Sequence, residues 1–321
     1  MRTSLYQHVC SGKMKSKGNI ESIVEINQSP KCYLVHHKSP YLMLGPFHLD
    51  IKMYSPFRCV YRDFYTEKEM NWMVGYSLPR LSATRVVPKS STSLTKAKLR
   101  QSSYSKRGFT VVKAIQTWFN DIEYKEPQNF VRISSNGEPL DYRHLPLKEP
   151  YSYSVIHPLM HGISRKIELS SGFNVTARHG ASKYQTTNYG LSGMVFPHID
   201  PYGYESGMEL NEDPERVQLC VTGDYIATFM GWFSQTEAGG GTAFIADDYE
   251  GVIEPGAGDA ALWTNLFSCH LKDPRSVHAG CPVLKGSKWI LNKWIHSWDQ
   301  WKKWPCDIVP HKSIIPKFTF Y

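Results

Sequence analysis

The sequence predicts an α+β, mainly β fold, in which an antiparallel jelly roll or barrel is supported by helices from the N-terminal half. Two observations predict it. After residue 183 the chain is a series of short β-rich runs separated by glycine and other turn residues. Before that point it contains segments with helical periodicity. The 321 residues, of which 41% are hydrophobic and 21% charged, exclude a disordered or fibrous protein and allow a large core.

Three segments of the first half predict helices. In the first, Thr66 and Glu69 have the spacing of a capping box, and apolar residues then recur at helical spacing until Pro79. The second segment spans residues 111–122 and the third spans residues 155–169. Between these two, residues 123–153 are polar and contain several prolines, which indicates an inserted loop.

Seven runs after residue 183 predict strands, because each is rich in β-branched or aromatic residues and is bounded by turn residues. They are residues 184–189, 194–199, 217–221, 225–233, 241–245, 260–266 and 289–296. We expect the helices to pack against one of the sheets that these strands form.

Charge and composition exclude several classes of partner. Lys and Arg number 37 against 29 Asp and Glu, a net charge of +8, but the basic residues are spread out and accompany no nucleic-acid-binding motif. We therefore expect no nucleic-acid partner. No run approaches the ~18 apolar residues of a membrane span, and no signal peptide is visible. The seven cysteines show no CxxC spacing, whereas sequons at Asn27 and Asn174 favour a lumenal protein.

The clearest chemical pattern is His198 and Asp200, two residues apart at the end of a predicted strand. Side chains at this spacing project from the same face and can bind one ion. About 80 residues later, His278 lies beside another strand-like segment. Two histidines and a carboxylate can form the facial triad of non-haem iron(II) oxygenases. Lys288 follows, and a buried lysine there could neutralise the distal carboxylate of 2-oxoglutarate.

These residues lie among motifs that occur in a fixed order. The motifs are residues 79–84 (PRLSAT), 188–193 (NYGLSG), 197–200 (PHID), 238–244 (AGGGTAF), 262–266 (LWTNL), 278–284 (HAGCPVL), 286–289 (GSKW) and 292–296 (NKWIH). With them, the sequence resembles the catalytic region of the α subunit of procollagen prolyl 4-hydroxylases, from about residue 6 to residue 306. The resemblance implies a double-stranded β-helix, or jelly roll, that hydroxylates peptidyl proline with Fe(II), 2-oxoglutarate and ascorbate.

The resemblance also implies a role for individual residues. The expected iron ligands are His198, Asp200 and His278. The expected 2-oxoglutarate contacts are Lys288, Tyr189 and Thr242, with His296 as the catalytic histidine that positions the other end of this cosubstrate. The expected peptide contacts are Val195, Tyr225 and Trp294. The resemblance implies disulfides Cys10–Cys32 and Cys281–Cys306, which would leave Cys59, Cys220 and Cys269 as free thiols.

On the same basis we expect a proline-containing substrate in secreted or collagen-like chains, protein disulfide isomerase as a partner and residence in the endoplasmic reticulum lumen. The chain divides into an N-terminal segment (residues 1–60), a dioxygenase domain (61–307) with the inserted loop, and a C-terminal tail (308–321). The family's dimerisation region and helical peptide-binding domain have no counterpart here, which indicates a truncated product or a short paralogue.

Two positions depart from the family pattern. Val195 and Tyr225 stand where the family has a tyrosine and an arginine that contact the peptide, so we expect poor use of (Pro-Pro-Gly) repeats. Two alternatives stay open: a 2-oxoglutarate oxygenase that acts on another peptide residue, and a weakly active subunit that binds a partner.

Overall fold

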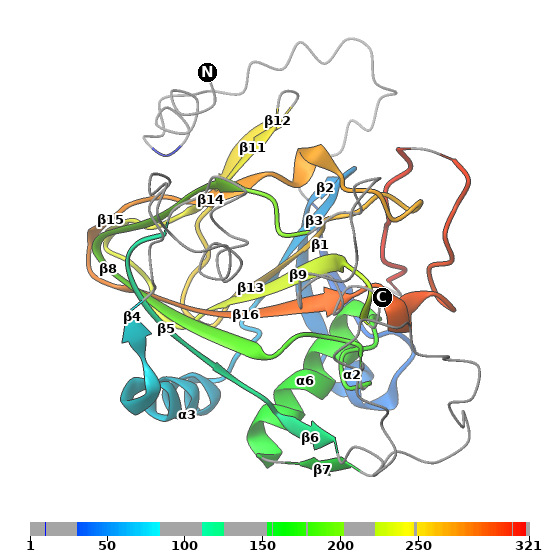
Figure 1. Ribbon diagram of the computed structural model, residues 1–321. Coiled ribbons are helices and arrows are strands. Elements are labelled where there is room, and N and C mark those ends of the chain that lie inside the picture. Colours follow the sequence, from blue (N-terminus) through cyan, green and yellow to red (C-terminus); the bar gives the residue numbers. More distant parts are fainter. Residues whose placement is uncertain are drawn as a thin grey trace, which may run out of the picture.

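The computed structural model describes residues 10, 31–83, 111–124, 153–155, 157–177, 179–201, 222–246, 249–309 and 311–318. Twelve of the described strands form one curled antiparallel sheet (Figure 1). Its main path runs β1-β2-β3-β13-β9-β16-β8-β14-β11-β12, with β5 on β8 and β4 on β5. The predicted mainly β fold with a curled antiparallel sheet is confirmed.

The strands of this sheet have the following bounds. They are β1 (Lys31–Val35), β2 (Phe47–Tyr54), β3 (Phe57–Arg62), β4 (Ser82–Ala83), β5 (Val111–Phe119), β8 (Tyr184–His198), β9 (Tyr225–Trp232), β11 (Thr242–Ala246), β12 (Tyr249–Ile253), β13 (Ala260–Thr264), β14 (His278–Gly280) and β16 (Lys288–His296). Two further pairs are β6 (Ile122–Tyr124) with β7 (Tyr153–Val155), and β10 (Ala238–Gly239) with β15 (Val283–Lys285).

The long strand β8 joins the two halves of the curl. Its first half pairs with β16, where Tyr189 lies opposite Lys288, and its end pairs with β14, where His198 lies opposite His278. Ser192, between the two halves, has a left-handed φ of 64°. The two runs predicted as separate strands are therefore one strand that changes partners. This change of partners places the end of β8 beside β14.

Helices cover one face of the sheet. Helix α3 (Glu67–Ser77) begins at the predicted capping box: Glu69 N donates to Thr66 Oγ1 and Thr66 N donates to Glu69 Oε2. Helix α6 (Pro158–Ser171) corresponds to the third predicted helix and ends at Gly172, with φ 76°. The short helix α2 (Pro40–Leu44) follows β1. Two of the three predicted helices, α3 and α6, are thus confirmed.

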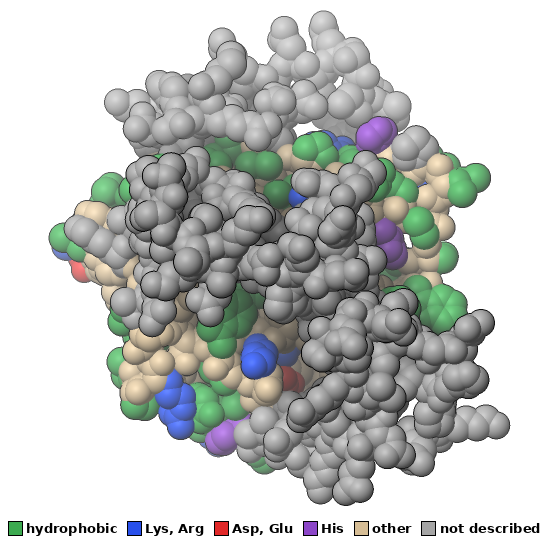
Figure 2. All heavy atoms as spheres, in the orientation of Figure 1, with side chains coloured by type: hydrophobic (Ala, Val, Ile, Leu, Met, Phe, Trp, Pro, Cys, Tyr) green, Lys and Arg blue, Asp and Glu red, His purple; other side chains and the backbone are tan. Residues whose placement is uncertain are grey.

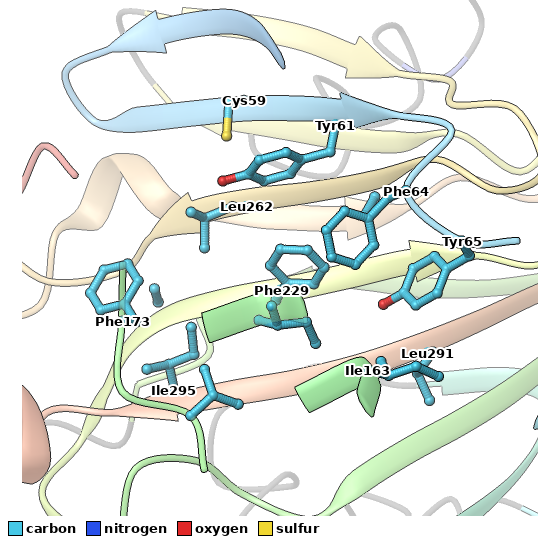
Figure 3. Packing of buried hydrophobic residues seen from close by; sticks show 14 of the residues in the cluster. Cys59, Tyr61, Phe64, Tyr65, Ile163, Phe173, Phe229, Leu262, Leu291 and Ile295 are labelled. Carbon is cyan, nitrogen blue, oxygen red and sulfur yellow. The ribbon is translucent and has the colours of Figure 1, made fainter. Parts of the chain in front are cut away.

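Two larger clusters and one small cluster of buried residues, the last around Ala243, Ile245, Ala279 and Cys281, form the core of the described residues. Figure 3 shows the largest cluster, in which Ile163 of α6 lies against Phe229, Leu291 and Ile295 of the sheet. Burial of each such side chain stabilises the fold by about 1.5–3 kcal/mol. The second cluster lies inside the curl and is built from a separate set of residues. They include Tyr189, Val195, Met230, Trp232, Phe244 and Trp263. Each central strand thus has one face toward the helices and one toward the interior of the jelly roll.

The helix predicted over residues 111–122 is wrong. Residues 111–119 form β5, which pairs with β8 along its length. The segment contains Val111, Val112, Ile115 and Thr117, and β-branched residues favour strands. The prediction also missed β1, β2 and β3, although Phe57, Cys59 and Tyr61 alternate along β3 and are buried.

The structure does not test the predicted division of the chain into three segments. The boundary at residue 60 falls inside β3, and residues 311–318 include the buried Ile314. The predicted strand at 217–221 and residues 125–152 of the predicted inserted loop lie outside the described residues. The division into three segments therefore stays a prediction.

Both expected disulfides are wrong. The structure pairs Cys10 with Cys281, which lies three residues after His278. Cys32 instead directs its Sγ to Asp50 Oδ1 at 2.8 Å, and Cys306 is an exposed free thiol. Motif matching cannot show which cysteines meet in space, because pairing depends on where the N-terminal segment lies. Cys59 and Cys269 are free thiols, and Cys220 lies outside the described residues.

Three further observations concern the surface charge, the second sequon and the question of a membrane-spanning helix. On the face shown in Figure 2, the described Lys and Arg side chains lie apart from one another. Asn174 of the second sequon donates from Nδ2 to Asp299 O at 2.7 Å and accepts from Lys303 Nζ at 2.8 Å, which gives it a structural role. Within the described residues, no helix combines the length and apolar composition needed to cross a membrane.

Candidate active site

Three side chains converge where β8 ends beside β14. The potential ligand atoms of His198, Asp200 and His278 all lie within 4.8 Å of one another. His198 Nε2 is 3.6 Å from Asp200 Oδ1, and His278 Nε2 is 3.7 Å from Asp200 Oδ2. The two histidine rings have centroids 4.3 Å apart. The structure thus brings together the three residues expected to bind iron.

The backbone orients both histidine rings. His198 Nδ1 lies 2.9 Å from Phe196 O, and His278 Nδ1 lies 3.0 Å from Ser276 O. A carbonyl can only accept, so each Nδ1 donates to its carbonyl, and the neutral form of each ring then presents the lone pair of Nε2 to a metal ion. Histidine ligands in metal sites commonly have this arrangement. Two Nε2 atoms and one carboxylate therefore fit a divalent iron ion with open coordination positions.

Lys288 lies inside the jelly roll and is only 3% exposed. Its Nζ is 3.4 Å from both Gly241 O and Thr242 Oγ1, and 5.8 Å from the centroid of the Tyr189 ring. Among the described residues, no carboxylate forms an ion pair with this ammonium, and burial lowers the pKa of Lys288 to about 7. The interior of the jelly roll therefore contains a cation that an incoming carboxylate could stabilise.

Tyr189 and Thr242 both lie near the Lys288 ammonium. Tyr189 pairs with Lys288 across β8 and β16, and burial raises the pKa of its phenol well above the usual value, so the hydroxyl stays protonated. Thr242 is 2% exposed on β11. The three expected cosubstrate contacts therefore lie close together in the buried interior of the jelly roll.

Aromatic rings stack near the other end of β16 from Lys288. The Trp294 ring stacks on Tyr225 at 5.8 Å and on Trp118 at 5.5 Å, and Tyr225 stacks on His296 at 5.3 Å. Burial lowers the pKa of His296 to about 4, which keeps this imidazole neutral. Trp118 on β5 is 41% exposed and marks the outer end of the stack. Tyr225, one of the expected peptide contacts, therefore touches both Trp294 and His296.

Val195, the third expected peptide contact, belongs to the interior cluster instead of this stack. It is 7% exposed and lies opposite Gly280 of β14. Sequence reasoning missed Trp118 because it assigned this segment to a helix. It also gave no role to Thr228 or Asn265, two buried residues beside the Asp200 carboxylate. The sequence feature that could have identified Asn265 is its place in the LWTNL motif.

Comparisons with known proteins agree with this geometry. Residues 184–296 match the model of the 2OG-Fe(II) oxygenase superfamily. Human prolyl 4-hydroxylase subunit alpha-3 is 32% identical over 179 residues, which cover 56% of this chain and 31% of that protein. Human prolyl 4-hydroxylase subunit alpha-1 is 33% identical over 152 residues, which cover 47% of this chain and 26% of that protein. These alignments thus span about a third or less of the curated relatives.

Among solved structures, a viral collagen prolyl hydroxylase from Paramecium Bursaria Chlorella virus-1, in complex with 2OG, matches with 15% identity and a TM-score of 0.43. The match covers 76% of this chain and 97% of that one.

Proposed function

We propose that this chain, which carries a 2OG-Fe(II) oxygenase domain over residues 184–296, hydroxylates peptidyl proline to 4-hydroxyproline. The observation that carries the proposal is the cluster of His198, Asp200 and His278 within 4.8 Å, beside the buried ammonium of Lys288. Relatives named as prolyl 4-hydroxylase subunits support the reaction type.

The three clustered residues would hold Fe(II). Bound Fe(II) and 2-oxoglutarate supply the chemistry, which is oxidative decarboxylation of the cosubstrate to succinate and CO2 coupled to hydroxylation at C4 of proline. His198 and His278 contribute neutral Nε2 atoms whose direction is set by Phe196 O and Ser276 O. With only three protein ligands, the remaining positions are open to the cosubstrate and dioxygen.

Lys288 would bind and orient the distal carboxylate of 2-oxoglutarate. A buried cation in a pocket of low polarity attracts a carboxylate more strongly than an exposed one does. The hydroxyls of Thr242 and Tyr189 would donate hydrogen bonds to this carboxylate. Because all three residues are buried, a carboxylate bound among them would be shielded from water.

The stacked rings of Trp294, Tyr225 and His296 would form the wall that receives the peptide. Tyr225 offers an aromatic face, whereas the family arginine would offer charged donors to peptide carbonyls. Val195 would contribute an apolar contact from the interior cluster. We therefore propose a proline-containing peptide as the substrate, with weak selection for (Pro-Pro-Gly) repeats.

Finer features of the proposal rest on the resemblance. They are ascorbate as a reductant, protein disulfide isomerase as a partner, secreted proline-rich or collagen-like substrates and residence in the endoplasmic reticulum lumen. The Cys10–Cys281 bond supports an oxidising compartment, since disulfides persist there and are rare in the cytosol.

The test combines two readouts on purified protein with Fe(II), 2-oxoglutarate, ascorbate and a panel of proline peptides. We expect succinate, and a peptide that gains the mass of one oxygen on proline. His278→Ala should abolish both, while His48→Ala, a change at an exposed histidine of β2, should leave both intact. Oxygen on another residue would instead favour the related oxygenase. Normal succinate output from His278→Ala would overturn the proposal.

A further inference from the structure

A chain of two hydrogen bonds leads from the carboxylate of Asp200 into the buried interior. Thr228 Oγ1 donates to Asp200 Oδ2 at 2.5 Å, and Asn265 Nδ2 donates to Thr228 Oγ1 at 2.8 Å. Thr228 is 1% exposed and Asn265 is fully buried. Neither residue belongs to the expected ligands or cosubstrate contacts, so their arrangement at this carboxylate calls for a separate explanation.

The protonation of the groups fixes the direction of both bonds. An ionised carboxylate can only accept, so the proton between Thr228 and Asp200 belongs to the threonine hydroxyl. The hydroxyl oxygen then has lone pairs for a donor, which the amide of Asn265 supplies. Asn265 therefore holds the Thr228 hydroxyl with its proton toward Asp200.

The strands keep both residues in place. Thr228 lies in the middle of β9, between β13 and β16, opposite Trp263 on one side and Trp294 on the other. Asn265 follows β13 directly, and its backbone N donates to Ile226 O at 2.9 Å. Thr228 thus belongs to a strand that is paired on both sides, and Asn265 is tied to that same strand.

We propose that Thr228 and Asn265 are positioning residues that orient the Asp200 carboxylate for Fe(II). The hydroxyl holds Oδ2 and so fixes the plane of the carboxylate beside the two histidine Nε2 atoms. A carboxylate held in this orientation would need less rearrangement to bind the ion. The inference rests on the proposed function, because it assumes that the cluster binds a divalent metal.

The test measures metal binding without turnover. Co(II) is titrated into the metal-free protein by calorimetry, in the absence of dioxygen and 2-oxoglutarate. Thr228→Val keeps the shape of the side chain and removes the donor, and we expect it to weaken Co(II) binding about tenfold or more, as loss of such outer partners commonly does. Thr228→Ser keeps the hydroxyl, so its affinity should stay within about threefold of the parent protein.

The outcomes separate the inference from the proposed function. If the parent protein binds no Co(II), the metal site itself and the proposed function fail. If the parent binds Co(II) but Thr228→Val binds equally well, or Thr228→Ser loses as much as Thr228→Val, the positioning role is overturned. Should the valine variant fail to fold, Asn265→Ala leaves every ligand and Thr228 in place. An unchanged Co(II) affinity in that variant also overturns the inference.

Discussion

Strand β16 carries two buried lysines that lie on opposite faces of the sheet and have different surroundings. Lys293 faces helix α6, where its Nζ is 3.1 Å from Asp121 Oδ1 and 3.9 Å from the centroid of the Tyr184 ring. Asp121 also accepts from Ser164 at 2.5 Å. Lys288 faces the interior of the jelly roll, where its recorded hydrogen-bond partners are Gly241 O and Thr242 Oγ1, each at 3.4 Å.

Both ammonium groups are 3% exposed, so burial alone does not distinguish them. Burial lowers the pKa of both, and at Lys293 the negative charge of Asp121 opposes this shift. A buried lysine that pairs with a carboxylate of the protein, as Lys293 does with Asp121, has a structural role. The described residues supply no such carboxylate to Lys288, so its charge is available to a ligand.

The largest expected effect concerns the paired lysine. Lys293→Met leaves Asp121 buried without its cation, and loss of one partner of a buried pair costs about 3–5 kcal/mol. We expect the free energy of unfolding in urea to fall by that amount. The double variant Lys293→Met with Asp121→Leu removes both charges and should recover most of it. A loss below about 1 kcal/mol in the single variant would show that the two lysines do not differ in this way.

The second prediction concerns the unpaired lysine. Lys288→Met removes this buried cation and should weaken 2-oxoglutarate binding about 100-fold, which corresponds to about 2.7 kcal/mol. The free energy of unfolding should not fall, because no buried carboxylate loses its partner. Calorimetry with the Co(II)-loaded protein measures the affinity. Lys285→Met, at an exposed lysine on β15, is the matched control and should bind 2-oxoglutarate normally.

A pH titration sharpens the comparison further. The carboxylate of 2-oxoglutarate needs the charged form of Lys288, whose pKa is lowered to about 7. As pH rises above this value, the free protein loses that proton and binding weakens. We expect the dissociation constant to rise about tenfold between pH 7 and pH 8.5. Lys288→Arg stays charged and should show no such rise; a parent curve as flat as that variant's would contradict the assignment.

The smallest effect is expected at Thr242. Its hydroxyl is one of the two polar groups that contact the Lys288 ammonium, so Thr242→Val should weaken 2-oxoglutarate binding by about 1 kcal/mol, or about fivefold. The Co(II) affinity of this variant should match that of the parent, since the metal ligands are untouched. Unchanged 2-oxoglutarate binding would show that the threonine only packs the interior.

The sequence predicted the site better than the fold around it. The prediction of the site rested on short-range patterns: His198 and Asp200 are two residues apart, and His278 and Lys288 lie in compact motifs. The structure brings the three expected iron ligands together. The family match confirms the recognised oxygenase region. The sequence predicted helix α3 because a capping box marks its start and Pro79 follows its end.

What the sequence did not predict depends on contacts between distant segments. Strand β5 has enough apolar residues to fit a helix, and its pairing with β8 decides its conformation. Lys293 gave no signal of its own, because its partner Asp121 lies 172 residues earlier. The same holds for Thr228 and Asn265, whose hydrogen bonds to each other and to Asp200 appear only in three dimensions.

The bond between Cys10 and Cys281 turns most of this chain into a covalent ring. The sequence separation of 271 residues makes the ring nearly as long as the chain, and in the chain-entropy estimate its closure stabilises the folded state by roughly 5 kcal/mol. A single proteolytic cut inside the ring therefore leaves the two parts of the chain covalently joined through the disulfide. The nicked protein should run at its full mass on a denaturing gel without reductant and fall into two fragments once the disulfide is reduced.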